Sequence, residues 1–112
     1  MSAQGPVVLV GLPGAGKSKV GRLLAERLGL AHIDTDALIV EREGRPIADI
    51  FASDGEAVFR LMETTAVADA LTHEAVVSLG GGAAVTPAVR ELLSGHTVVY
   101  IDAPHEELVR RT

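Results

Sequence analysis

The stretch VVLVGLPGAGKS, residues 7–18, decides the fold of this chain. Residues 7–10 are apolar without polar alternation, which is typical of a strand buried on both faces in a parallel sheet. A glycine-rich segment follows at residues 11–16, and residues 18–28 carry apolar side chains at helical spacing. The stretch therefore predicts a strand, a phosphate-binding loop and a helix in direct succession, the context in which a GxxxxGK[ST] motif is meaningful.

The composition of this loop suits phosphate binding. Glycines let backbone N–H groups surround phosphate oxygens without Cβ clashes, and the start of the helix adds a partial positive charge. Lys17 can reach the β- and γ-phosphates of a nucleotide, and Ser18 can place its hydroxyl on Mg²⁺. The predicted nucleotide contacts in this stretch are Gly14, Ala15, Gly16, Lys17, Ser18 and Lys19. The alternatives are a plain glycine-rich turn and, for Lys19, a solvated helix residue, which we favour over a second phosphate contact.

The rest of the chain continues the alternation of strands and helices. Further strands are predicted at residues 31–33, 75–79 and 96–101. Helices are predicted from residue 37 to Gly44, at residues 46–52, after Gly55 to about residue 71, at residues 86–93 and after Pro104. This order predicts a three-layer α/β fold with a parallel central sheet, and residues 1–112 are expected to form one domain.

Bulk composition argues against several functions. The formal net charge is -5, which disfavours a nucleic-acid or anionic-membrane surface. The chain has no cysteine, as suits a reducing cytosol, and no apolar run approaches the ~20 residues of a membrane span. We therefore expect a cytoplasmic protein that binds neither nucleic acid nor a membrane.

Polar residues follow two further predicted strands. Asp34 and Asp36 come after the second strand, and the glycines of residues 80–82 come after the third. Ligands of open α/β sheets collect at the carboxyl ends of the strands, so one crevice is expected to hold these residues and the phosphate loop. The alternatives are that an aspartate only caps the following helix and that the glycines only make a tight turn.

These motifs together resemble the shikimate kinases. The matching motifs are residues 11–18, Asp34-Thr35-Asp36, Ile50-Phe51, Gly55-Glu56 leading to Phe59-Arg60 and Glu63, and residues 79–82. The resemblance implies a nucleoside monophosphate kinase-like fold, with the P-loop strand central in a five-stranded parallel sheet. It also implies ATP-dependent phosphorylation of shikimate to shikimate 3-phosphate in chorismate and aromatic amino acid biosynthesis, with Mg²⁺ as cofactor and a monomeric complete enzyme.

The resemblance assigns roles by position. It makes Asp36 the group that binds the acceptor hydroxyls and takes the attacking proton, and it places Asp34 near Mg²⁺ through water. Arg60 would pair with the shikimate carboxylate, held by Glu63, and Phe51 and Phe59 would contribute to the core and the pocket wall. The remaining contacts that it implies are Gly81 and Gly82 for the acceptor and Arg111 for adenine. The alternatives are a solvated pair of Arg60 with Glu63 and a solvated Arg111.

The sequence also departs from the family. A shikimate kinase continues into a lid with a further arginine, a fifth strand and a closing helix, so we expect an incomplete domain with impaired catalysis. The fourth strand is then expected to be a bare edge with Val98, Val99 and Ile101 uncovered, which favours self-association. Two alternative functions stay open: a P-loop kinase for another small polyol acid such as gluconate, and an inactive nucleotide-binding module.

Overall fold

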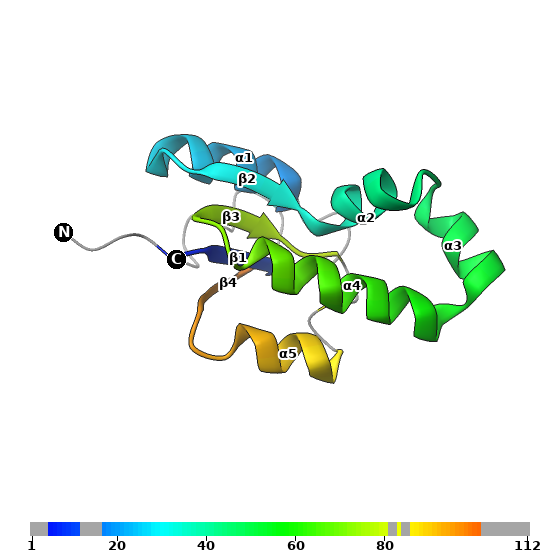
Figure 1. Cartoon of the computed structure of the whole chain (residues 1–112). Helices are drawn as coiled ribbons and strands as arrows, with labels where there is room; N and C mark the ends of the chain where they lie inside the picture. Colours follow the sequence, from blue (N-terminus) through cyan, green and yellow to red (C-terminus); the bar gives the residue numbers. More distant parts are fainter. Residues whose placement is uncertain (1–4, 12–16, 81–82, 84–85, 102–112) are drawn as a thin grey trace.

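The computed structural model describes residues 5–11, 17–80, 83 and 86–101. Strands and helices alternate along most of this chain (Figure 1). In order they are β1 Val7–Gly11, α1 Lys17–Leu28, β2 Ala31–Asp34, α2 Thr35–Glu43, α3 Ile47–Asp54, α4 Glu56–Ala70, β3 Ala75–Ser78, α5 Pro87–Leu93 and β4 Thr97–Ile101.

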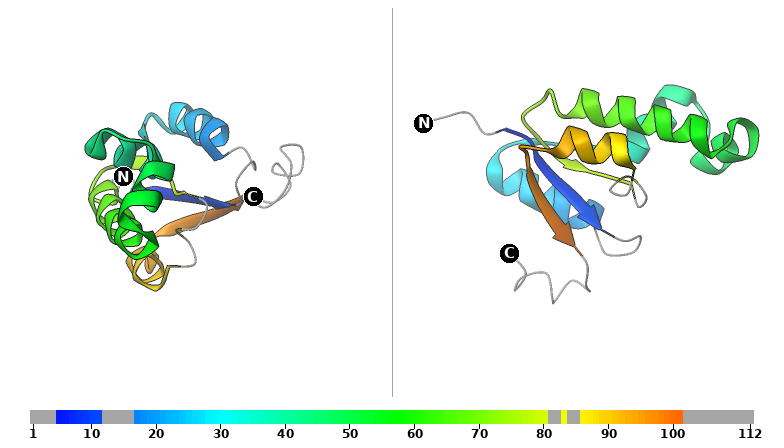
Figure 2. Two further views of the ribbon diagram at one scale, coloured as in Figure 1. Left: turned by 90° about the vertical axis from the view of Figure 1, so that its right-hand side faces the viewer. Right: turned by 90° about the horizontal axis from the view of Figure 1, so that it is seen from below.

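The strands form one parallel sheet with the order β2-β3-β1-β4. Strand β1 is internal and pairs Val7 with Val76 on one side and with Thr97 on the other. Helix α1 covers one face of the sheet, whereas α4 and α5 cover the opposite face (Figures 1 and 2). This arrangement confirms the predicted three-layer α/β fold with a parallel sheet and an internal P-loop strand.

The apolar run of β1 serves two cores because successive side chains of a strand point to opposite faces. Val8 and Val10 belong to the cluster beneath α4 and α5, together with buried Val67 and Val89. Leu9 points to the other face and packs with three buried residues. They are Ala25, Val76 and Ile101. The strand therefore lacks polar alternation because both of its faces are covered.

Helices α2, α3 and α4 enclose a third, smaller core built on Ile39, Ile50, Phe59 and Ala66. These helices project past the carboxyl ends of β2 and β3 (Figure 1). Two arginines brace them at the surface. Arg42 on α2 forms an ion pair with Asp69 on α4 at 2.8 Å. Arg45 forms ion pairs both with Glu43 at the end of α2, at 3.1 Å, and with Asp54 at the end of α3, at 2.7 Å. The result is a helical platform beside the sheet edge at which the strands end.

Some predicted boundaries were wrong. Helix α2 begins at Thr35 rather than residue 37, because β2 runs to Asp34 and Asp34 caps the helix. Pro46 is the N-cap of α3 rather than its first residue, and α3 continues to Asp54. Val98, Val99 and Ile101 are not uncovered: the two valines are half-buried against the cores on either face of the sheet, and Ile101 is 2% exposed on the α1 side. The helix predicted after Pro104 lies outside the described residues, and among those that are described no helix is long and apolar enough to cross a membrane.

Gly21 lets α1 lie close to the sheet. A Cβ at this position would be 2.5 Å from Nε2 of His32 and 2.6 Å from Oγ of Ser78. Alanine usually stabilises a helix interior by about 1 kcal/mol relative to glycine. We expect Gly21→Ala instead to destabilise the protein by about 1–3 kcal/mol, because the methyl group overpacks this contact.

Urea denaturation of the wild type and Gly21→Ala measures this effect. Arg27→Ala, an exposed change in the last turn of the same helix, is the control and should stay within about 0.5 kcal/mol of the wild type. A Gly21→Ala protein more stable than the wild type would contradict the close approach of α1 to His32 and Ser78.

Candidate functional site

The candidate site lies at the sheet edge where the parallel strands end. β1 ends at Gly11, directly before the glycine-rich loop, and β2 and β3 end in register at Asp34 and Ser78. Gly14, Ala15, Gly16, Gly81, Gly82 and Arg111 lie outside the described residues. Lys17 and Ser18 are the first residues of α1, but their side chains are not described. The geometry of the site is therefore described through Asp34, Asp36, Gly80 and Arg60.

Asp34 is the N-cap of α2. Its backbone is extended, with φ -103° and ψ 117°, and its Oδ1 accepts a hydrogen bond from the Ala37 N–H at 3.1 Å. Aspartate is a preferred residue here because it satisfies an N–H group that has no partner within the helix. Asp34 therefore caps the helix, and its role toward Mg²⁺, which the family resemblance implies, stays a prediction.

Two substitutions separate these roles of Asp34. Asp34→Ala removes the cap and should lower the free energy of unfolding by about 1 kcal/mol. Asp34→Asn keeps a capping oxygen, so its stability should stay within about 0.5 kcal/mol of the wild type, whereas the loss of charge should weaken Mg²⁺ binding. Urea denaturation and a Mg²⁺ titration of the ADP complex measure the two effects. Unchanged Mg²⁺ affinity in Asp34→Asn would leave Asp34 with the capping role alone.

Asp36 lies in the first turn of α2, half-buried against the segment that follows β3. A Cβ built on Gly80 would be 2.7 Å from both Cγ and Oδ2 of Asp36. The Gly80 backbone therefore contacts the carboxylate directly, and no larger residue fits there without moving it. The structure thus brings Asp36 together with the start of the glycine turn, as the sequence predicts.

Arg60 is held on α4 by a buried carboxylate. Its Nη1 donates to Oε1 of Glu63 at 2.9 Å, and its Nη2 lies 3.5 Å from Oε2 of Glu56. The Glu63 side chain is 1% exposed and that of Arg60 is 27% exposed. The alternative of a solvated Arg60–Glu63 pair is therefore wrong. Burial lowers the pKa of Arg60, but the hydrogen bond and charge of Glu63 outweigh it, so the pKa lies above its usual value and the guanidinium stays charged.

Two aromatic rings complete the support of Arg60. The guanidinium carbon lies 5.4 Å from the centroid of Phe59 and 6.0 Å from that of Phe51, within the range of cation–π attraction. The rings themselves contact each other, with centroids 4.7 Å apart. Phe59 is buried in the core of the helical platform, whereas Phe51 is 36% exposed. A planar cation held in this way is suited to pair with a carboxylate through two parallel hydrogen bonds.

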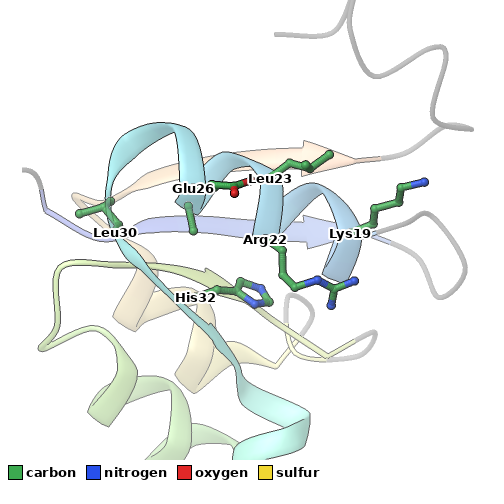
Figure 3. Close-up of a pocket in the computed structure, with 7 residues that line it drawn as sticks. Lys19, Arg22, Leu23, Glu26, Leu30 and His32 are labelled. Carbon is green, nitrogen blue, oxygen red and sulfur yellow. The ribbon is translucent and has the colours of Figure 1, made fainter.

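Lys19 is exposed and lines a groove of about 610 Å³ on the outside of α1. Arg22, Glu26 and His32 are among the other residues that line it (Figure 3). Figure 3 shows the Lys19 side chain extending away from His32. This position fits the solvated reading of Lys19, and its contact with phosphate stays a prediction.

A polar contact behind the site was not predicted from the sequence. Nε2 of His32 lies 2.9 Å from Oγ of Ser78, and Thr35 donates its hydroxyl proton to the Ser78 carbonyl oxygen at 3.3 Å. Burial is the main cause that lowers the pKa of His32. The one available signal was a serine inside the otherwise apolar segment of residues 75–79, since a buried hydroxyl requires a partner.

The phosphate side has oxygen donors suited to a hard cation. Mg²⁺ keeps several waters and takes few ligands from the protein, so the Ser18 hydroxyl and the Asp34 carboxylate fit it by chemistry. Within the described part of the chain, no group of three or more His, Asp and Glu residues could hold a metal ion.

Comparison with known proteins gives one consistent answer. The family model described as shikimate kinase matches residues 13–112. The shikimate kinases of Mycobacterium avium (strain 104) and Mycobacterium tuberculosis (strain H37Ra) are 59% and 58% identical to this chain over 106 residues. That alignment covers 94% of this chain and 60% of each relative, so the chain spans about 60% of their length.

Solved structures agree with the sequence comparison. The shikimate kinase of Acinetobacter baumannii in complex with shikimate superposes with a TM-score of 0.85 at 40% identity, covering 97% of this chain and 62% of that one. The enzyme of Aquifex aeolicus gives 0.81 at 38% identity, covering 96% and 65%. A gluconokinase of Sinorhizobium meliloti gives 0.51 at 22% identity and shows a shared fold alone. This chain belongs to the shikimate kinase family.

Proposed function

We propose that this protein transfers the terminal phosphoryl group of ATP to a hydroxyl of shikimate, in the biosynthesis of chorismate and the aromatic amino acids. The observation that carries the proposal is Arg60, a guanidinium fixed by buried Glu63 and two aromatic rings and thereby suited to an acidic acceptor. The position of Asp36 against Gly80, at the sheet edge that the P-loop strand also reaches, supports it.

The residues divide the work between donor and acceptor. Backbone N–H groups of Gly14, Ala15 and Gly16 would surround the β- and γ-phosphates, and Lys17 would neutralise their charge. Ser18 directly and Asp34 through water would hold Mg²⁺, which supplies charge neutralisation on the phosphates when bound. Arg111 would lie against adenine, and Lys19 would be a peripheral phosphate contact.

On the acceptor side, Arg60 would bind the carboxylate of shikimate, and the backbone of Gly81 and Gly82 would contact its ring. Asp36 would orient the attacking hydroxyl and accept its proton as the new P–O bond forms. The bond from the γ-phosphorus to the bridging oxygen breaks in the same step, and ADP leaves. The chemistry is mainly positioning and charge neutralisation, which explains why rigid support of Arg60 matters.

The sheet and its covering helices support one further proposal, that residues 1–112 act as a single domain. A monomeric state of the complete enzyme stays an implication of the family resemblance, and a cytoplasmic location stays a prediction from the sequence.

A titration followed by NMR tests the proposed function. Isotope-labelled protein, expressed from its own gene, is titrated first with ADP and Mg²⁺ and then with shikimate. A parallel titration uses gluconate in place of shikimate. We expect nucleotide to shift the amide signals of residues 14–18, and shikimate but not gluconate to shift those of Asp36, Arg60 and Gly81.

Lys17→Ala should abolish the response to nucleotide, while Arg27→Ala at the far end of α1 should keep it. A coupled assay of ADP production with each acceptor gives the rate. A response to nucleotide without any response to shikimate would refute the acceptor assignment, and ADP production with gluconate in preference to shikimate would replace it.

A further inference from the structure

Two neighbouring strands and a helix meet at one buried serine. Ser78, the last residue of β3, is 1% exposed. Its Oγ lies 2.9 Å from Nε2 of His32 on β2, and its carbonyl oxygen accepts the hydroxyl proton of Thr35 on α2. Ser78 therefore fixes the end of β3 to the end of β2 through its side chain and its main chain together.

Helix α1 leaves this contact little room to move. The space that a Cβ on Gly21 would occupy is already taken by Nε2 of His32 and Oγ of Ser78. In Figure 3 the His32 ring extends from β2 toward α1, beside the Arg22 side chain. The imidazole is thus confined between the strand that carries it, Ser78 and the helix that follows the phosphate loop.

The groups that this contact fixes are direct neighbours of the acceptor site. Thr35 immediately precedes Asp36, and Gly80 follows Ser78 by two residues. Between them, Leu79 donates its N–H to the Leu9 carbonyl oxygen of β1 at 3.0 Å. Since the Gly80 backbone touches the Asp36 carboxylate, a displacement of Ser78 would change the place of Gly80 relative to that carboxylate.

A leucine or valine at residue 32 would fill the same space but could not bond to Ser78. The loss of a buried hydrogen bond is costly, and the groups that it joined are then held less firmly. The hydrogen bond from the histidine therefore restrains the end of β3 more tightly than apolar packing alone would.

We propose that His32 is a positioning residue for the acceptor site, because its hydrogen bond to Ser78 holds Gly80 in place against the Asp36 carboxylate. The inference rests on the proposed function, since it concerns the acceptor that Asp36 binds. His32 itself touches no reacting atom and acts only through Ser78.

Steady-state kinetics of the protein as produced from its own gene tests this role. Ser78→Ala and His32→Leu each remove the hydrogen bond, and we expect each to lower kcat/KM for shikimate by about threefold to tenfold, the worth of one buried hydrogen bond. KM for ATP should stay unchanged. The double variant should lose no more than the worse single variant, because both changes remove the same interaction. His32→Gln, whose amide reaches the position of Nε2, should recover most of the activity.

Val77→Ala is the matched control. Val77 adjoins Ser78 on the same strand, is fully buried, and packs on the opposite face of the sheet beneath α4 and α5. It should destabilise the protein, as urea denaturation of every variant will show, without changing kcat/KM for shikimate.

The outcomes are distinct. If the His32 and Ser78 variants only lose stability, as Val77→Ala does, or if their effects add fully, the positioning role is wrong. If wild-type protein does not phosphorylate shikimate, the proposed function fails and this inference fails with it. Ser78→Ala removes a single oxygen, so it supplies the decisive comparison even where His32→Leu does not fold.

Discussion

Replacing Gly80 by alanine is expected to lower the rate of phosphoryl transfer to shikimate by about a hundredfold, a loss typical of a 1 Å misplacement of a reacting group. The added methyl group would be 2.7 Å from Cγ and Oδ2 of Asp36, so the carboxylate has to move away from its position. Nucleotide binding should persist, since Gly80 belongs to the segment after β3 and not to the phosphate loop.

The matched control for this substitution is Gly5→Ala. A Cβ at Gly5 would meet no atom within 4 Å, so the same chemical change should leave the rate unaltered. Stopped-flow or coupled measurements of ADP formation give the rate, and isothermal titration with ADP gives nucleotide affinity. A Gly80→Ala protein with wild-type turnover would mean that the Asp36 carboxylate has no fixed place in the reaction.

The second large effect is expected for Arg60→Ala, which should weaken shikimate binding by about thirtyfold or more. The substitution removes the cation proposed to pair with the acceptor and leaves the Glu63 carboxylate, 1% exposed, without the guanidinium that neutralises it. We expect the free energy of unfolding to fall by about 2 kcal/mol, less than for a fully buried pair because the Arg60 side chain is 27% exposed.

Two further variants separate binding from stability. The double variant Arg60→Met/Glu63→Met replaces the pair by apolar side chains, so it should recover stability without recovering affinity. Arg60→Lys keeps the charge but loses the planar fork, so its affinity should lie between those of wild type and Arg60→Ala. Isothermal titration with shikimate and urea denaturation measure both quantities. If Arg60→Ala binds shikimate as tightly as wild type, Arg60 serves only to neutralise Glu63.

Much of the fold was predictable from local signals. The run at residues 7–10 was recognisable as a buried strand because it lacks polar alternation, and Gly29 and Gly44, both at positive φ, mark the ends of helices α1 and α2. The start of α2 was less predictable, because Asp34 can end a strand and cap a helix in the same position. The family resemblance predicted a central P-loop strand, whereas the full order of the strands was not predicted, since the local pattern fixes no neighbours.

The candidate site, like the fold, was predictable only in part. Asp36 and Arg60 were singled out by the family resemblance, since an aspartate at a helix start and an arginine three residues from a glutamate are each common without it. The burial of Glu63 was not predictable, because three-residue spacing from Arg60 is equally typical of a solvated helix surface. The hydrogen bond between His32 and Ser78 was not predictable for another reason. It joins side chains of two different strands, and no local sequence pattern shows which side chains of two strands will meet.

The strand order has a consequence for how the chain reaches this structure. β1 pairs with β3, through Val7 and Val76, and β2 has β3 as its neighbour in the sheet. During synthesis, β1 therefore has no neighbouring strand to pair with until about residue 78 has left the ribosome. Pairings between residues so far apart form slowly, because the intervening chain must first be ordered. We therefore expect β1 and β2 to join one sheet only when β3 inserts between them, which brings the ends of these two strands to the same edge.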